Sequence, residues 1–332
     1  MPQATIEDYS ASIEVPQMIL ATKLRGGNVV KKNSRQIKYS GGFCVVFPFE
    51  NHGDKYAVRC WHVTVDDIRR RTKCIADAIG STTLPYFVRF EYVNEGIRTA
   101  QGIQPIVIMD WVNALTLKKY ISKHLGDGDR LRKLAESFKT MVSDLHKVHF
   151  AHGDLQHGNI MVKDDGSLIL VDYDSMYVPS LSGASDDIKG LAGYQHPARW
   201  SNKTLSEKVD YFSELIIYTS IIGLLKFPEL WSQLSLEDSE TMLFSAEDLK
   251  NPNNAQIFSI LEKDTETGEL ARKIKDELSY SSLNDLEPLE LATVDKAQEL
   301  MDNLSRRWED NGYKKPAGRD LNVLTDGITR KW

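Results

Sequence analysis

Two hydrophobic segments near residue 50 have the composition of β-strands. They run from Phe43 to Phe49 and from Lys55 to Trp61, and both are rich in β-branched and aromatic side chains. The residues between them, 50–54, are polar and include a glycine, which suits a tight turn. The pattern therefore predicts an antiparallel β-hairpin.

The spacing of hydrophobic residues changes to that of a helix over residues 63–80. Gly80 can end this helix, and two more strand-like segments follow at 86–93 and 104–112. We therefore expect the first part of the chain to be rich in strands, with one helix. On or near one face of that helix lie the apolar residues Val65, Ile68, Ile75 and Ile79.

The character of the chain changes after Trp111. The segment from Arg130 to Phe150 predicts an amphipathic helix, two short strands follow at 159–162 and 168–171, and the residues beyond Asp210 have helical patterns. The apolar stripe of the long helix consists of Leu131, Leu134, Phe138, Met141, Val142 and Leu145. A small β-rich lobe thus precedes a larger helical lobe, and a cleft between two lobes is a common place for a ligand.

The charge balance and the apolar runs exclude several classes of protein. The chain has 332 residues, of which 41 are basic and 47 acidic, and this net charge of −6 argues against a nucleic-acid-binding chain. The most apolar run, Leu215 to Leu225, is shorter than the roughly 18 residues of a membrane span, so we interpret it as a buried core helix. Three cysteines without CxxC spacing suggest neither disulfides nor a zinc site, and the polar N-terminus does not resemble a signal peptide. We therefore expect a cytoplasmic protein with no membrane or nucleic-acid partner.

Three side chains with oxygen ligands follow the long helix at fixed spacings. Asn159 comes five residues after Asp154, and Asp172 comes thirteen residues after Asn159, across the predicted strand–turn–strand. This arrangement can bring two carboxylates and an amide oxygen to one point. Oxygen ligands with one or two carboxylates are what Mg²⁺ carrying nucleotide phosphates prefers. The alternative is a set of turn and cap residues, because Asp and Asn are favoured at such positions.

The combined spacing resembles that of the protein-kinase superfamily, whose catalytic loop reads H-R-D-x-x-x-x-N and whose metal-binding motif is D-F-G. The corresponding segments here read HGDLQHGN and VDYD, and GYQHPAR (193–199) resembles the A-P-E segment. Together with SGGF and YAVRCW, this set is most similar to a bacterial branch of serine/threonine-kinase-like proteins that is often associated with signalling modules. The resemblance implies an α+β, bilobal protein-kinase-like fold with a small antiparallel β-rich N-lobe and a larger, mainly helical C-lobe.

The resemblance also implies a division of the chain. Residues 1–35 are expected to be an extension that packs on or leads into the N-lobe, and residues 36–110 to form the N-lobe itself. Residues 111–310 are expected to form the C-lobe, and residues 311–332 a polar C-terminal tail.

Each residue of the central motif receives a role from the resemblance. Asp154 would accept or orient the proton of the substrate hydroxyl, while Asn159 and Asp172 would hold Mg²⁺, or Mn²⁺ in its place, against the phosphates of ATP. His152 would have a structural role beneath the metal-binding strand. Asp210 would brace the catalytic loop.

The resemblance implies a nucleotide-binding set in the N-lobe and at the junction of the lobes. Two glycines would let the backbone approach phosphates, a basic residue would contact them, and the adenine would meet small or apolar side chains and two backbones. These residues are Gly41, Gly42, Arg59, Ala57, Met109 as the gatekeeper, and the backbones of Asp110 and Val112. Taken alone, the glycines also fit an ordinary hairpin, and the arginine fits a surface residue paired with a carboxylate.

Some positions depart from the family pattern on the phosphate-binding side. Arg59 replaces the family's lysine, and this exchange alters both bulk and hydrogen-bonding geometry. The helix predicted over 65–79 contains no glutamate to pair with it, and Asp77 is the best candidate. Gly153 replaces the arginine of H-R-D, the usual partner of an activation-loop phosphate. We therefore expect activity that does not depend on phosphorylation of residues 180–190.

Other departures concern the catalytic loop and its surroundings. Gln156 replaces a lysine that contributes positive charge, and His157 either supplies part of that charge or is a solvated loop residue. Asp174 stands where D-F-G has glycine, and it serves either as a further metal ligand or as a cap for the following turn.

Three functions compete at this point. The first is Mg-ATP-dependent phosphoryl transfer to Ser or Thr hydroxyls of a protein substrate. The second is a pseudokinase that serves as a nucleotide-binding or interaction scaffold, which the Arg59 exchange favours and the intact motif opposes. The third is a small-molecule kinase, since HGDLQHGN also resembles the loop of aminoglycoside- and choline-kinase-like enzymes; GYQHPAR and Asp210 oppose it. We favour the protein kinase.

Overall fold

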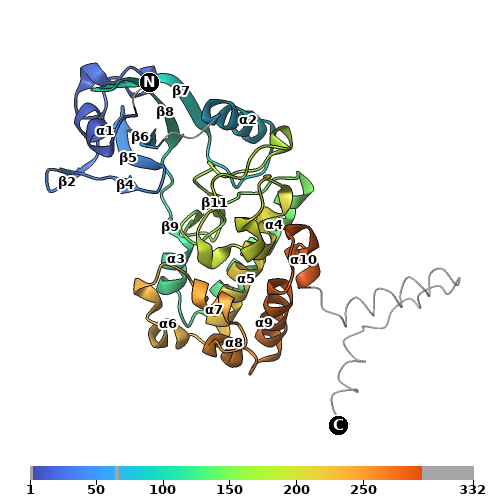
Figure 1. Ribbon diagram of the computed structural model, residues 1–332. Helices are drawn as coiled ribbons and strands as arrows, with labels where there is room; N and C mark the ends of the chain where they lie inside the picture. Colours follow the sequence, from blue (N-terminus) through green and yellow to red (C-terminus); the bar gives the residue numbers. More distant parts are fainter. Residues whose placement is uncertain (1–2, 64–66, 294–332) are drawn as a thin grey trace, which may run out of the picture. The chain divides into compact units, whose positions relative to one another are not determined.

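A six-stranded antiparallel sheet forms the N-terminal lobe of the computed structural model, which describes residues 3–63 and 67–293 (Figure 1). The order along the sheet is β1-β5-β6-β8-β7, and β4 pairs with β5. Helices make up most of the C-terminal lobe, so the predicted α+β, bilobal fold is confirmed. The sheet strands are β1 (Asn28–Val29), β4 (Tyr39–Ser40), β5 (Cys44–Asn51), β6 (Asp54–Trp61), β7 (Phe90–Thr99) and β8 (Gly102–Asp110).

The predicted hairpin is present as β5 and β6, which pair along their whole length. Val45, Phe47 and Phe49 alternate along β5 and are fully buried, as expected for residues that share one face of a strand. This face packs against α1 (Ile6–Ser12), whose N-terminus is closed by a capping box between Thr5 and Asp8. The hydrophobic pattern of the strands therefore determines where the N-lobe core lies.

The segment before the sheet contacts it directly. Tyr9 of α1 is buried, and its hydroxyl donates a hydrogen bond of 3.0 Å to the backbone oxygen of Trp61. A small separate ribbon follows, formed by β2 (Lys31–Lys32) and β3 (Arg35–Gln36).

The helical lobe is built around two long helices. The apolar stripe predicted for the helix over residues 130–150 is buried along α4 (Gly128–Lys147). This helix packs against α5 (Tyr211–Lys226). Nearly every residue of α5 is buried, in agreement with its interpretation as a core helix. No helix in the described part of the chain is both long and apolar enough to cross a membrane. The remaining helices and strands of this lobe are β9 (Leu115–Thr116), α3 (Leu117–Lys123), β10 (Ile160–Val162), β11 (Leu168–Leu170), α6 (Leu230–Gln233), α7 (Ala246–Lys250), α8 (Gln256–Leu261), α9 (Thr265–Leu278) and α10 (Leu289–Ala292).

Two predicted boundaries in the N-lobe were wrong. Helix α2 (Ile68–Ser81) continues through Gly80 and ends at Ser81, and the N–H of the following residue, Thr82, still donates to the carbonyl of Ala78. The strand predicted over 86–93 begins only at Phe90, because the residues before it pair elsewhere: the Tyr86 carbonyl accepts a 2.7 Å hydrogen bond from the backbone of β11.

Some predictions fall outside the described residues. Val65, placed on the apolar face of the first helix, is one of them. The C-terminal tail predicted over 311–332, and residues 294–310 of the expected C-lobe, also lie outside.

Candidate active site

The β10–β11 hairpin brings two of the motif residues together. Ile160 pairs with Leu170, so Asn159 precedes one strand while Asp172 follows the other, close beside it. The backbone N–H of Val171 donates to the carbonyl of Asn159 at 3.0 Å, which fastens this end of the hairpin. Short apolar strands with polar residues at their ends therefore place an amide and a carboxylate at one edge of the hairpin.

Asp154 lies within hydrogen-bond distance of Asn159. The amide nitrogen of Asn159 donates to the Asp154 carbonyl at 2.8 Å and to its carboxylate oxygen Oδ2 at 3.0 Å. The backbone N–H of Leu191 donates to the other oxygen, Oδ1, at 3.1 Å. Burial raises the pKa of Asp154 above its ordinary value. The structure thus gathers Asp154, Asn159 and Asp172 in one place, as the spacing predicted.

The backbone of the catalytic loop is held from below by Asp210. Its carboxylate accepts hydrogen bonds from the N–H groups of His152 and Gly153, the latter at 3.0 Å. The His152 ring nitrogen Nε2 lies 2.9 Å from the carbonyl of Val171, directly before Asp172. His152 and Asp210 therefore connect the catalytic loop with the metal-binding strand.

Gly153 occupies a position where a larger residue does not fit. Its φ is +78°, a region that residues with a side chain rarely adopt, and a Cβ there would lie 2.0 Å from the carbonyl oxygen of Ser175. The glycine that replaces the family's arginine is thus required by the close approach of the segment after Asp174.

Arg59 is buried and pairs with two carboxylates of the segment that follows β11 (Leu168–Leu170). Its Nη2 lies 2.7 Å from Asp172 Oδ1 and 2.6 Å from Asp174 Oδ2. Burial opposes ionisation of Asp172, but the charge and hydrogen bond of Arg59 outweigh it, so the pKa of Asp172 lies below its ordinary value. For Asp174 burial prevails, and its pKa is raised. The alternative of a surface arginine is therefore wrong, although a carboxylate partner was correctly expected.

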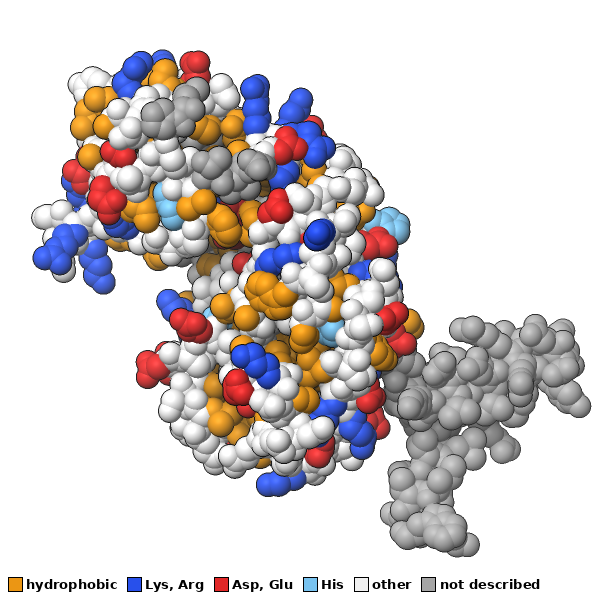
Figure 2. Space-filling model, viewed as in Figure 1, with side chains coloured by type: hydrophobic (Ala, Val, Ile, Leu, Met, Phe, Trp, Pro, Cys, Tyr) orange, Lys and Arg blue, Asp and Glu red, His pale blue; other side chains and the backbone are white. Residues whose placement is uncertain are grey.

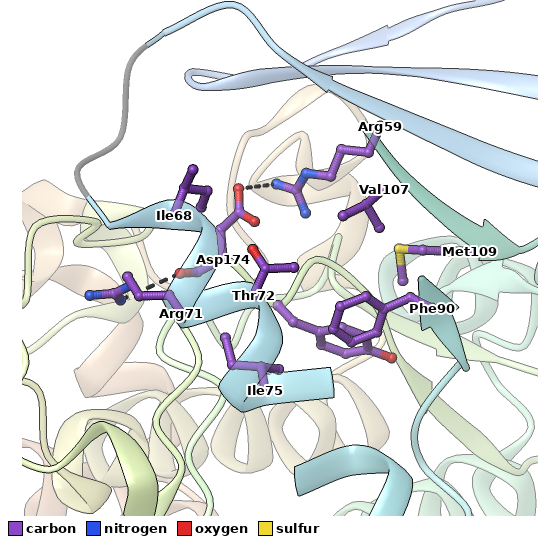
Figure 3. A pocket seen from close by; sticks show the side chains of 10 residues that line it. Arg59, Ile68, Arg71, Thr72, Ile75, Phe90, Val107, Met109 and Asp174 are labelled. Atoms are coloured by element: carbon purple, nitrogen blue, oxygen red, sulfur yellow. Dashed lines mark hydrogen bonds and ion pairs between the residues drawn. The ribbon is translucent and has the colours of Figure 1, made fainter. Parts of the chain in front are cut away.

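The prediction that Asp77 pairs with Arg59 was also wrong. Asp77 is exposed on α2 and does not line the cavity beside Arg59, whereas Thr72 of the same helix does. A small cavity of about 20 Å³ separates this helix from the sheet, and Figure 3 shows Thr72 and Asp174 within it. In the structure Asp174 is a partner for Arg59, and its role as a further metal ligand or as a cap stays a prediction.

The activation segment is anchored by Arg199, whose role the sequence did not reveal. Arg199 is completely buried, and its guanidinium forms two hydrogen bonds with Asp186, at 3.1 and 3.0 Å. It also donates to the carbonyl of Gly153 and to the side chain of Gln195. In the structure, the pair is recognised by the burial of Arg199 beside Asp186. A tertiary contact of this kind leaves no periodic pattern in the sequence.

The prediction of a solvated loop histidine at position 157 was wrong. His157 is half-buried, and its Nδ1 forms a 2.6 Å hydrogen bond with the hydroxyl of Tyr194. Burial lowers the pKa of His157 to about 4, so the ring is neutral near pH 7 and supplies no positive charge. Gln156, in place of the family's lysine, lies 3.4 Å from the carboxylate of Asp154.

The residues expected around the adenine lie along the middle of the sheet. Ala57 of β6 is directly opposite Met109 of β8, and the Asp110 backbone follows at the end of that strand, with Val112 two residues beyond. Figure 2 shows a hollow in the surface between the two lobes. Ala57 and Met109 are therefore neighbours.

The two glycines lie in the turn between β4 and β5. The Gly41 N–H donates to the carbonyl of Cys44 at 2.9 Å, which closes the turn. A Cβ added at Gly42 would meet no atom within 4 Å, and one at Gly41 would meet only the Cys44 carbonyl, at 3.8 Å. The side-chain positions of both glycines thus have room for a Cβ, so close packing does not require glycine at either one.

The donor set around Asp172 fits a magnesium ion that is bound mainly through phosphates. The Asp172 side chain is 42% exposed, so its carboxylate is accessible even while it contacts Arg59. In the described residues no group of three or more His, Cys, Asp or Glu side chains could hold a metal by itself. Magnesium at nucleotide sites needs only one or two protein carboxylates, because substrate phosphates and water supply the remaining ligands.

Comparison with known proteins agrees with this geometry. No match was found among curated proteins. A family model described as the protein kinase domain matches residues 40–307, which is most of the 332-residue chain and includes every predicted site residue. The protein-kinase resemblance of the motifs is thereby confirmed, and the chain belongs to the protein kinase family.

Proposed function

We propose that this kinase transfers a phosphoryl group from Mg-ATP to Ser or Thr hydroxyls of a protein substrate. The observation that carries the proposal is the grouping of Asp154, Asn159 and Asp172 at one end of the β10–β11 hairpin, opposite the buried cation of Arg59. Two carboxylates, an amide and a fixed positive charge are the groups that phosphoryl transfer requires. We further propose a cytoplasmic signalling role and a bacterial origin, on the resemblance of the motifs alone.

The residues of the catalytic loop would act on the substrate hydroxyl. Asp154 would orient this hydroxyl and accept its proton, since its Oδ1 keeps acceptor capacity beyond the hydrogen bond from Leu191. Asn159 and Asp172 would hold Mg²⁺, or Mn²⁺, and the metal would neutralise charge on the phosphates. Positioning, more than basicity, is the task of Asp154.

The nucleotide would lie between the lobes. Arg59 would contact the phosphates, and the turn at Gly41 and Gly42 would cover them with its backbone. The adenine would meet Ala57 and the gatekeeper Met109, and its polar edge would bond the backbones of Asp110 and Val112. We also propose that residues 1–35 extend the N-lobe of residues 36–110, since α1 packs on the sheet, and that residues 111–310 form the C-lobe.

A protein substrate is favoured over a small molecule by the segment after Asp174. This segment is ordered against the catalytic loop: Tyr177 bridges Ala151, and Leu191 donates to Asp154. Arg199 fixes its far end through Asp186. A long, fixed surface beside the catalytic aspartate gives an extended peptide a place to bind, which a small hydroxyl compound does not need.

Phosphate transfer from labelled ATP tests the proposal. The full chain is incubated with labelled ATP and Mg²⁺ or Mn²⁺, with a mixture of proteins and, separately, with small hydroxyl compounds. We expect label on Ser or Thr of protein. Label on the small compounds instead would favour the aminoglycoside- and choline-kinase-like alternative. No transfer, together with retained ATP binding, would favour the pseudokinase scaffold.

A further inference from the structure

The two carboxylates that contact Arg59 have different surroundings. The side chain of Asp172 is 42% exposed, whereas that of Asp174 is only 11% exposed and that of Arg59 only 7%. Asp172 is therefore accessible to a ligand. Asp174 lies deeper, on the closed side of the same cation.

Asp174 is held in this place by two other groups. The indole nitrogen of Trp61 donates to its Oδ2 at 3.4 Å, and Arg71 of α2 donates to its backbone carbonyl at 3.5 Å. Arg71 also donates to the carbonyl of Ser185 at 2.8 Å, further along the activation segment. The Asp174 carboxylate thus has a fixed position relative to both the sheet and α2.

In the protein kinase family, a carboxylate on the helix that corresponds to α2 pairs with the phosphate-binding cation. Here no acidic side chain of α2 contacts Arg59. Asp77 is the one acidic residue of α2 (Ile68–Ser81), and it is exposed. Thr72 lines the cavity beside Arg59, where its short hydroxyl side chain cannot carry a negative charge (Figure 3). A buried guanidinium needs a paired carboxylate, because an uncompensated buried charge is costly.

We propose that Asp174 is the positioning residue for Arg59, taking over from the metal-binding strand the task that a carboxylate of α2 would otherwise perform. The inference rests on the proposed function, since it assigns Arg59 to the nucleotide phosphates. Asp174 holds the guanidinium in place while Asp172, which shares the same nitrogen of Arg59, is free to exchange that contact for a metal ion.

This arrangement has a consequence for control of the site. In kinases that pair the cation with a helix carboxylate, movement of the helix makes and breaks the pair. Here Arg59 belongs to β6, and Asp174 belongs to the segment that follows β11. The ion pair itself therefore contains no residue of α2, and α2 contributes to it through the contact of Arg71 with the backbone carbonyl of Asp174.

The test measures nucleotide affinity of the full chain by calorimetry with a non-hydrolysable ATP analogue, in EDTA and again with Mg²⁺. Asp174→Asn preserves the shape of the side chain and removes its charge. We expect its Kd for the analogue in EDTA to rise about tenfold, the effect of losing one charged hydrogen bond. Asp77→Asn, the matched change on the exposed face of α2, should leave the Kd unchanged.

A double-mutant cycle separates positioning from a structural effect. Once Arg59→Met has removed the cation, adding Asp174→Asn should change the Kd no further, whereas independent effects would add. Thermal melting of each variant shows whether it is folded. Additive effects would overturn the inference, as would an effect seen only with Mg²⁺, which would make Asp174 a metal ligand.

The outcome also separates this inference from the proposed function. Binding of the analogue by the wild type with an unchanged Kd in Asp174→Asn would remove the inference alone. Absence of any binding by the wild type would remove the proposed function, and the inference with it.

Discussion

Two sides of the site are assembled in different ways. On the acceptor side, which comprises the catalytic loop and the activation segment, Asp154 and Asn159 keep the residues of the family motif, and buried hydrogen bonds fix them. On the cation side, which comprises Arg59, Asp172 and Asp174, Asp172 keeps the motif residue but Arg59 and Asp174 depart from the family, and the Asp172 carboxylate is partly exposed.

This difference between the two sides indicates which residues of the site can change under the proposed function. Phosphoryl transfer depends on the position of the acceptor hydroxyl, which under the proposed function would be set by Asp154 in a loop braced by Asp210. Under the proposed function, Arg59 would supply the positive charge of the family's lysine with a different bulk and hydrogen-bonding geometry, and its carboxylate partners lie outside α2. The cation side would then differ from the family pattern while the acceptor side keeps it.

The largest effect is expected at the centre of the acceptor side. Asp154→Asn should lower turnover about 10²- to 10⁴-fold, because the amide cannot accept the hydroxyl proton. The Kd for ATP, measured by calorimetry, should stay the same, since the nucleotide-binding residues are untouched. Equal phosphate transfer by the variant and the wild type would remove Asp154 from its assigned role.

The buried ion pair of the activation segment should govern stability more than nucleotide binding. Arg199→Met leaves Asp186 buried without its main partner, and we expect a loss of about 3–5 kcal/mol in the free energy of unfolding, measured by urea denaturation. Arg199→Met with Asp186→Leu should recover part of this loss, since the buried carboxylate is removed together with its arginine, while Lys189 loses its contact with Asp186. A single variant as stable as the wild type would contradict the assigned role.

Substitution of Gly153 tests whether the fold requires a glycine at the position where the family motif has an arginine. Gly153→Ala should lower the free energy of unfolding by about 2–4 kcal/mol, through backbone strain and collision with Ser175. Gly166→Ala is the matched control, because Gly166 has a φ of +85° but open space around it. Its loss should be limited to about 1–2 kcal/mol of backbone strain. Equal losses at both positions would show that the contact with Ser175 is unimportant.

The smallest effect is expected from removal of phosphate. The activation segment is already fixed by Arg199 and Asp186, and Gly153 leaves no arginine in the catalytic loop to bind a phosphate on residues 180–190. Phosphatase treatment should therefore leave the rate of phosphoryl transfer unchanged. Loss of activity after treatment would show that a phosphate completes the acceptor side.

Local patterns in the sequence were sufficient for much of this account. The hairpin of β5 and β6, the stripe of α4 and the grouping of Asp154, Asn159 and Asp172 follow from periodicity and spacing within short segments. These features depend on residues close in the chain, where the residue order determines which side chains share a face.

The features that the sequence did not reveal are contacts between distant segments. The choice between Asp77 and Asp174 as the partner of Arg59 depends on how α2 rotates against the sheet, and a single helix does not specify its own rotation. The burial of His157 likewise depends on Tyr194, which lies 37 residues further along the chain.

The most direct test of the account is the thermal stability of wild type and Asp172→Asn with ATP, with and without Mg²⁺. Ligands that bind the folded state raise the melting temperature. We predict that ATP stabilises the wild type further when Mg²⁺ is added, and that Asp172→Asn loses this additional increment. An equal Mg²⁺-dependent increment in both proteins would contradict the assignment of Asp172 as a metal ligand, on which the proposed chemistry depends.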